Sequence, residues 1–379
     1  MNQKELGEIR RRIRPEKNNI SHIYGCYVNE KREIISDFDA QLHTMPQEDA
    51  EKYMALLHKT LSGALGRNLL DISFSSQQVM EGEEHQLLSE LRRTELGDAE
   101  LRQALYSRII EAVSFEDSGC LILLAFDTYD VPYKGKDDSD QPDASAEVFR
   151  YMLCAVCPVK PGKLELAWFS QEQGFHSFLA GHTASAPEMG FLFPTFDGRQ
   201  ANIYNALLYT RSASDVHQEL IDAVFRTEPL MSAEAQKETF HVALRGTLEK
   251  DCSFDVVQSV NEQLHDRIAE HKESKDPEPL ELSIREAGDI LRNSGVSEEK
   301  TDAFCEKCEA DFGENAVLRP SNLIGTRRYE IATPGVTVQV DPEYSYLVET
   351  RRLNGHKYIL ISADDGLTVN GMDVEIPEG

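Results

Sequence analysis

The chain has 379 residues, of which 40% are apolar and 28% charged, and its formal net charge at pH 7 is −27. This composition is typical of a soluble globular protein with two or three domains, and the negative charge disfavours contact of its body with nucleic acid or anionic lipid. The longest apolar runs, residues 120–126 and 151–157, are seven residues long, whereas a membrane span needs about 20. The chain starts without the apolar segment of a secretion signal and scatters seven cysteines along its length, so we expect reduced thiols and a cytoplasmic protein.

Residues 1–20 are expected to form a basic N-terminal arm. Its basic residues are candidate contacts to nucleic-acid phosphates or to an acidic partner: Arg10, Arg11, Arg12, Arg14 and Lys17. Alternatively, the segment is an amphipathic helix that docks by Leu6, Ile9 and Ile13 and pairs its arginines with the acidic body. The sequence leaves both interpretations open.

An α+β main domain is predicted over residues 21–271. Spacing of apolar residues predicts helices over residues 46–65, 82–95, 98–113, 214–225 and 254–268. Strands are predicted over residues 22–28, 33–36, 69–74, 119–131, 147–159, 164–169 and 189–208, with a solvated acidic loop at 134–146. No helix-length segment separates the strands between 119 and 169, so we expect a mixed or antiparallel central sheet.

A smaller C-terminal α+β domain is predicted over residues 280–379, after a linker at 271–279. Ser283 and Glu286 form a plausible capping box at the start of one helix, and Ser297 precedes another. Strict alternation over residues 336–340 indicates a strand. Asn354-Gly355 is the residue pair that type I′ hairpin turns prefer, and Asn370-Gly371 repeats it. This module is therefore expected to combine helices with hairpins.

Two Cys-x-x-Cys pairs, Cys154/Cys157 and Cys305/Cys308, suggest a four-thiolate zinc site. For both pairs, the sequence favours an alternative interpretation, in which the cysteines are packed side chains and not metal ligands. Residues three apart in a strand point to opposite faces, which separates Cys154 from Cys157. Cys305 and Cys308 extend an apolar helical stripe with Phe304, as packed small side chains do. We therefore predict no zinc.

Other candidates for chemistry are acidic residues and two histidines. Asp127, Asp130 and the acidic loop could hold a hard cation, but the spacing lacks the glycine and glutamate of a calcium loop. His176 and His182 lie in a Gly- and Ser-containing segment without a nucleophile elbow. The chain also lacks a phosphate-binding loop and a dinucleotide-binding turn. No cofactor, metal or catalytic residue is predicted.

Residues 4–12, 18–20 and 25–29 resemble a bacterial family that is known only as a domain of unknown function, and the resemblance covers nearly the whole chain. It implies no activity.

The order of elements is more distantly similar to a family of acidic bacterial nucleoid-associated proteins. The similarity rests on the strands at 119–123 and 150–156, the strand-to-helix junction at 207–225, and the closing tract from 318 onward. It implies association with the nucleoid, for example through a DNA-handling protein such as a type II topoisomerase. The junction carries Arg211 beside Ser212 and Asp215, where that family is richer in glycine and basic residues, and this departure disfavours DNA contact there.

We therefore expect a non-enzymatic nucleoid-associated or regulatory binding protein that uses a DNA-handling partner or weak DNA contact. One alternative is a metal-dependent hydrolase that uses the Asp127/Asp130 region. Another is an acidic scaffold that binds a basic protein, since residues 251–320 carry 18 acidic and 8 basic side chains. No membrane contact is expected, and the oligomeric state is left open, with a dimer as one option.

Overall fold

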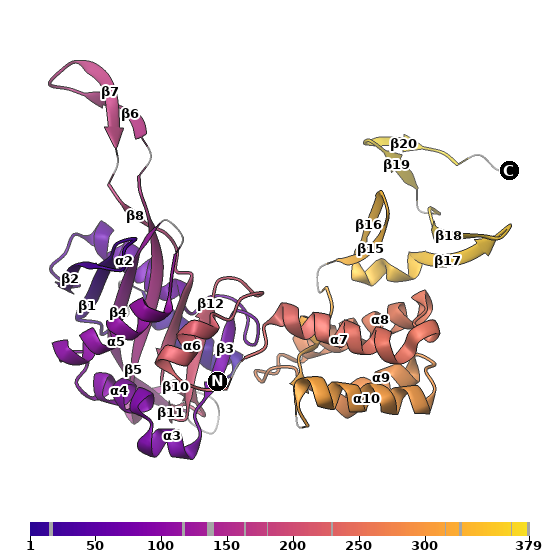
Figure 1. Cartoon of the computed structure of the whole chain (residues 1–379), viewed down its shortest axis with the longest axis horizontal. Helices are drawn as coiled ribbons and strands as arrows, with labels where there is room; N and C mark the ends of the chain where they lie inside the picture. The colour runs from indigo at the N-terminus through magenta and orange to yellow at the C-terminus, as the bar shows by residue number, and fades with distance from the viewer. Residues whose placement is uncertain are drawn as a thin grey trace. The chain divides into compact units, whose positions relative to one another are not determined.

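The computed structural model describes residues 1–14, 18–115, 118–134, 140–162, 164–179, 181–228, 230–314, 316–325, 328–364 and 366–376 (Figure 1). Its Cα positions group into two compact units. Unit 1 comprises Met1–Ala233 with Pro277–Pro279, and unit 2 comprises Glu234–Asp276 with Leu280–Gly379. The chain is α+β, as predicted.

The boundary between the units differs from the one expected near residues 271–280. Helices α7 (Ala233–Leu248) and α8 (Phe254–Ser274) bury Phe240, Leu244 and Leu264 in one apolar core with the later helices of the chain. A core shared among neighbouring elements is what defines a compact unit, so these two helices belong to unit 2.

Eight of the described strands of unit 1 form one antiparallel sheet. Its order is β2-β1-β4-β5-β9-β12-β3, with β8 paired to β5 beyond the end of β9. The strands are β1 (His22–Val28), β2 (Ile34–Gln41), β3 (Leu69–Ser73), β4 (Gly119–Lys134), β5 (Asp140–Lys160), β8 (Thr183–Ala184), β9 (Met189–Phe193) and β12 (Asn205–Thr210). The prediction of a mixed or antiparallel central sheet is confirmed.

Both faces of this sheet are buried, which explains the continuous apolar runs of its central strands. Along β5, Met152 and Cys154 lie in the core on one face, whereas Leu153 and Ala155 lie in the core on the other. Antiparallel sheets often leave one face in water and then alternate apolar with polar residues. Here helices cover both faces, and no alternation is needed.

Six helices are described in unit 1: α1 (Gln3–Arg12), α2 (Gln47–Lys59), α3 (Ser76–Glu81), α4 (Glu83–Arg93), α5 (Ala99–Ala112) and α6 (Gln218–Val224). Helices α4, α5 and α6 contribute Leu88, Ile109 and Leu220 to the core with Met152. Helices α1 and α2 contribute Leu6 and Leu57 to the core on the opposite face. The sheet is therefore sandwiched between two helical layers (Figure 1).

Three predictions for this part of the chain need correction. Most of the loop expected at 134–146 belongs to the long hairpin of β4 and β5, and residues 135–139 lie outside the described residues. The strand expected over 189–208 is interrupted, because the short hairpin of β10 (Thr195–Asp197) and β11 (Gln200–Asn202) separates β9 from β12. The linker was expected to start at residue 271, but residues 271–274 still belong to helix α8. Helix α7 was missed altogether.

Unit 2 has a helical core followed by separate hairpins. The core elements are α7, the turn η1 (Glu249–Asp251), α8, the pair β13 (Leu282–Ser283) and β14 (Val317–Leu318), α9 (Ile284–Asn293), α10 (Glu298–Phe312) and α11 (Pro320–Leu323). As predicted, Ser283 caps α9 in a capping box with Glu286, and Ser297 is the N-cap of α10.

The hairpins of unit 2 do not join into one sheet in the part of the chain that is described. They are β15 (Tyr329–Thr333) with β16 (Val336–Val340), β17 (Val348–Leu353) with β18 (His356–Ile361), and β19 (Leu367–Val369) with β20 (Met372–Val374), and the turn η2 (Pro342–Leu347) precedes β17. Asn354 and Gly355 have φ of 52° and 86°, as the predicted type I′ turn requires. Asn370-Gly371 shows the same pattern.

Candidate functional site

Helix α1 packs into the core of unit 1. Leu6, Ile9 and Ile13 are buried against α2 and the sheet. Burial of a large apolar side chain is worth about 1.5–3 kcal/mol, so three of them hold the helix firmly in place. Of the two interpretations of this segment, the docked amphipathic helix is the one that the structure shows.

Arg10 is occupied by backbone acceptors. Its Nε donates to the carbonyl oxygen of Leu61 at 2.5 Å, and its Nη2 donates to that of Gly63 at 2.7 Å. Burial lowers the pKa of Arg10. These bonds tie α1 to the loop after α2, so Arg10 acts in the fold and is not free to bind a phosphate.

Arg12 forms a two-pronged ion pair with Asp127 of β4. Its Nε and Nη2 lie 3.1 Å and 3.3 Å from the two carboxylate oxygens, and Asp127 is 1% exposed. The hydroxyl of Tyr151 and the backbone N–H of Asn19 also donate to this carboxylate, at 2.6 Å and 3.0 Å. Burial opposes the charge of Arg12, but the hydrogen bond and charge of Asp127 outweigh it and raise the pKa of Arg12.

The other three predicted contact residues differ from Arg10 and Arg12. Arg11 and Arg14 are exposed and have no carboxylate partner among the described residues. Lys17 lies outside the described residues. Of the five basic residues singled out in the sequence, Arg11 and Arg14 alone are described as open to a partner.

The two carboxylates proposed for a hydrolase lie apart. Asp127 is buried and saturated by its donors, whereas Asp130, three residues on, is exposed. Residues at this spacing in a strand point to opposite faces. Among the described residues, no group of three or more His, Cys, Asp or Glu side chains is placed to hold a metal ion. The geometry of Asp127 and Asp130 therefore gives no support to this alternative.

The cysteines behave as packed side chains. Cys154 lies in one core of unit 1 and Cys157 in the other, which separates them across the sheet as the strand spacing predicts. Burial raises the pKa of Cys157 to about 12 and that of Cys308 to about 12. These thiols stay protonated at neutral pH and are poor metal ligands or nucleophiles.

The two predicted histidines lie near a surface hairpin. This hairpin consists of β6 (Leu164–Phe169) and β7 (Gly174–Leu179), and His176 on β7 lies 3.1 Å from the carboxylate of Glu172. His182 lies 6.1 Å from the ring of Tyr27 and lines a hollow of about 390 Å³. The interactions described for these rings are with the carboxylate of Glu172 and with the aromatic rings of Phe169 and Tyr27.

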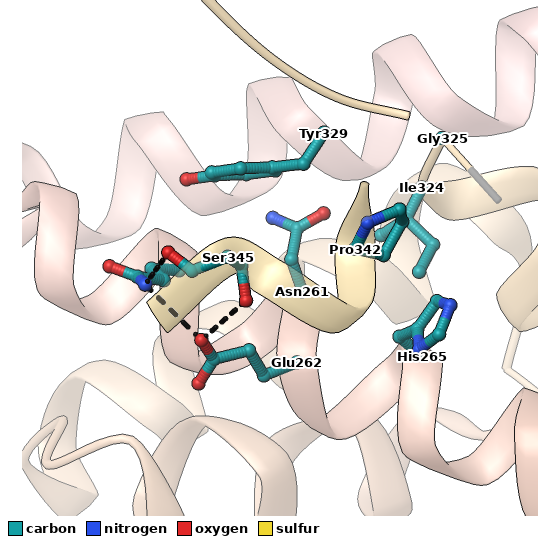
Figure 2. Close-up of a pocket in the computed structure, with 9 residues that line it drawn as sticks. Asn261, Glu262, His265, Ile324, Gly325, Tyr329, Pro342 and Ser345 are labelled. Carbon is teal, nitrogen blue, oxygen red and sulfur yellow. Dashed lines mark hydrogen bonds between the residues drawn. The ribbon is translucent and has the colours of Figure 1, made fainter. Parts of the chain in front are cut away.

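A polar pocket in unit 2 lies where η2 meets α8 (Figure 2). The hydroxyl of Ser345 donates to the Glu262 carboxylate at 2.8 Å, and the Gln258 amide donates to the Ser345 carbonyl at 2.9 Å. Burial and then the charge of Glu262 raise the pKa of Tyr329. The space is about 20 Å³, enough for one water molecule, whereas ligand pockets measure about 300–1,000 Å³. The hydrogen bonds of Ser345 with Glu262 and Gln258 therefore hold η2 against α8.

The tip of the β17–β18 hairpin carries the basic residues that the sequence analysis overlooked. Arg352 and Lys357 are directly opposite each other in the register, one on each side of the Asn354-Gly355 turn. Both are exposed and have no ion pair among the described residues. Arg351 is also exposed, and it pairs with Glu349 at 2.8 Å. The signal was in the sequence, because basic residues flank a recognisable hairpin turn.

The polar clusters described above hold elements of the fold together, because Arg12 and Asp127 join α1 to β4, and Ser345 and Glu262 join η2 to α8. The described surface also presents exposed basic and apolar side chains on separate hairpins. None of the described helices is long and apolar enough to cross a membrane.

The chain belongs to the family called domain of unknown function DUF4317, which it matches over residues 1–372. This confirms the resemblance to such a family seen in the sequence. A comparison with curated proteins found no match, so nothing in the comparisons supports the more distant similarity to nucleoid-associated proteins.

Proposed function

We propose that the protein is a non-enzymatic, cytoplasmic binding protein with a nucleoid-associated or regulatory role, which makes a weak contact with nucleic acid through the tip of the β17–β18 hairpin. One observation carries the proposal: Arg352 and Lys357 face each other across the hairpin without a counter-charge among the described residues. We therefore place the proposed nucleic-acid contact in unit 2. It does not lie at Arg10 and Arg12 of the N-terminal segment, because these side chains already bind other parts of the protein.

Electrostatics explain why this pair suits a phosphate. Side chains directly opposite on an antiparallel pair have Cβ atoms about 4.5–5.5 Å apart, and like charges there repel. A phosphate oxygen between the two cations removes the repulsion and gains charge-assisted hydrogen bonds. Arg351 and Tyr358 form the neighbouring pair on the other face, where Tyr358 adds an aromatic ring and Arg351 pairs with Glu349. Aromatic rings next to basic residues are typical of surfaces that bind single-stranded nucleic acid.

The local charge also supports the proposal. Residues 348–361 contain three Lys or Arg and one Glu, so the hairpin carries a net charge of +2 in a chain of −27. The acidic remainder repels DNA at long range, so binding is expected to be weak and limited to this tip. A regulatory or nucleoid role therefore needs either a high local DNA concentration or a DNA-handling protein that the chain also contacts.

The test is titration of a fluorescein-labelled DNA duplex, followed by fluorescence anisotropy, at salt concentrations between about 50 and 200 mM. Each phosphate contact contributes about −0.9 to the slope of log K against log salt, so contacts by Arg352 and Lys357 predict a slope of about −2. The R352A/K357A variant is expected to bring this slope close to zero and to weaken binding at low salt.

A matched control variant removes two positive charges from the N-terminal segment, which is the other candidate surface. The R11A/R14A variant loses two exposed arginines of the N-terminal segment and is expected to bind DNA as the wild type does. If R11A/R14A loses binding, or if R352A/K357A retains it, the hairpin tip is not the contact.

A second candidate is an acidic scaffold that binds a basic protein. The exposed surface of α10 favours it, because its acidic residues repeat along one helix: Glu298, Glu299, Asp302, Glu306 and Glu309. Affinity purification from the native cytosol, with and without nuclease, distinguishes the two. A partner that survives nuclease but dissociates at high salt supports the scaffold, whereas loss on nuclease treatment supports contact through nucleic acid.

A further inference from the structure

The β6–β7 hairpin of unit 1 forms a separate two-stranded ribbon. It leaves the central sheet after β5 and returns through β8, and its strands pair with no third strand among those described (Figure 1). A two-stranded ribbon is marginally stable in water, and independent stability takes a third strand or packing of an apolar face. The structure describes no element of unit 1 packed against its Trp168 face.

One face of this ribbon is apolar and exposed. The register places Trp168 directly opposite Phe175, with Leu166 two residues before Trp168 on the same face. The two rings lie 5.3 Å apart, and Leu166, Trp168 and Phe175 are 68%, 54% and 61% exposed. Exposed apolar side chains that lie together on one surface are typical of interaction sites.

The charge of the segment indicates what covers the face. Residues 160–185 contain Lys160, Lys163, Glu165 and Glu172, which sum to zero in a chain of net charge −27. A nucleic acid finds too few cations here, and an anionic lipid surface would repel the acidic body. The partner surface that best matches this face is one that is also apolar and carries no net charge. Two copies of this acidic chain repel each other least where each presents a neutral hairpin that projects from its body.

We propose that the β6–β7 hairpin is a homodimerisation element, in which the Leu166–Trp168–Phe175 face of one copy packs on the same face of a second copy. A twofold axis lets one patch meet itself, so no second complementary surface is required. Stacked sheets pack about 10 Å apart, a spacing that buries these side chains between the two ribbons. The face is small beside a standard interface of about 1,600 Å², so we expect micromolar affinity. This inference goes beyond the proposed function and does not depend on it.

The test exploits Trp168, the sole tryptophan in the sequence. Its fluorescence reports directly on the hairpin, because no other residue emits at its wavelength. Sedimentation velocity and tryptophan emission are measured on the full chain across a concentration series from about 1 to 100 µM, around the expected dissociation constant. We expect a monomer–dimer transition and, over the same range, a blue shift of the emission as Trp168 leaves water.

The variant L166E/F175E keeps Trp168 and places two charges on the face. It is expected to remain monomeric with red-shifted emission at all concentrations, while its circular dichroism melt matches the wild type because the face lies outside both cores of unit 1. The control S170E/Q171E adds the same two charges beyond the apolar face, at residues that are exposed, and is expected to dimerise.

Three results would overturn the proposal. The first is a wild-type chain that stays monomeric over the whole series. The second is a dimer that persists in L166E/F175E, which would place the interface elsewhere. The third is a wild-type monomer whose emission shifts to the blue with vesicles of neutral phosphatidylcholine, which would make the occupant a lipid surface.

Discussion

At the scale of single residues, neighbouring arginines of one helix have opposite environments. Arg12 lies against the sheet with its side chain 17% exposed and its charge matched by Asp127, while Arg11 points to solvent. Arg12 also lies 4.3 Å from the ring centroid of Tyr129, a cation–π contact. A helix turns by about 100° per residue, so adjacent side chains cannot share a face.

We predict that R12A destabilises the protein by about 3–5 kcal/mol, since it leaves the buried Asp127 carboxylate without its counter-charge. The double variant R12A/D127N is expected to recover part of this loss, because the amide carries no charge to desolvate. Chemical denaturation followed by circular dichroism measures both, and R11A serves as the control with a change within about 0.5 kcal/mol. A loss in R12A no larger than in R11A would show that the pair contributes nothing.

At the scale of elements, local capping residues decide where helices begin. The hydroxyl of Ser283 accepts from the backbone N–H of Glu286 at 3.2 Å, and the Glu286 carboxylate accepts from the backbone N–H of Ser283 at 2.7 Å. The backbone and side-chain hydrogen bonds from Ser283 hold the pKa of Glu286 below its ordinary value. The ionised carboxylate therefore accepts these hydrogen bonds more strongly than the neutral acid does.

We predict that S283A lowers the stability of unit 2 by about 1 kcal/mol at neutral pH. Because the pKa of Glu286 is lower in the folded state, the contribution of its charge is present above about pH 4.5 and is lost as the pH falls through the folded-state value. The difference between wild type and S283A should therefore shrink in acid. Denaturant titrations at neutral pH and near pH 3.5 measure it, and a difference independent of pH would contradict this account.

Hairpins show the same local control. Positive φ at Asn354 and Asn370, each followed by a glycine with positive φ, sets the two-residue turns of β17–β18 and β19–β20. The turn fixes the register, and the register brings Arg352 opposite Lys357. The proposed nucleic-acid contact is thus a consequence of two residues that lie between the strands.

At the scale of the whole molecule, the net charge of −27 opposes folding, because like charges repel more in the compact state. We predict that raising NaCl from about 20 to 300 mM raises the midpoint of thermal unfolding by a few degrees, since salt screens this repulsion and exposed ion pairs contribute little. Differential scanning calorimetry across the salt series measures the shift. A midpoint that falls with salt would mean that attractive pairs dominate.

The sequence predicted what depends on near neighbours. The capping box at Ser283, the Asn354-Gly355 turn and the prediction of a mixed or antiparallel sheet follow from residues that lie close together or in direct succession. Helix α7 was missed even though Phe240, Leu244 and Leu248 recur at helical spacing, so the signal was present. From the sequence, the two interpretations of the N-terminal segment could not be distinguished, because Arg12 pairs with a residue that is 115 positions away.

The sequence by itself determined the charge, the α+β class, the helix caps and the hairpin turns, because each depends on composition or on interactions within a few residues. The tertiary structure decided which charges are available. Arg10 and Arg12 are held by Leu61, Gly63 and Asp127, whereas Arg352 and Lys357 face each other without a counter-charge among the described residues. Whether a charged side chain is free depends on which distant segments the fold brings beside it, and spacing along the chain carries no record of that.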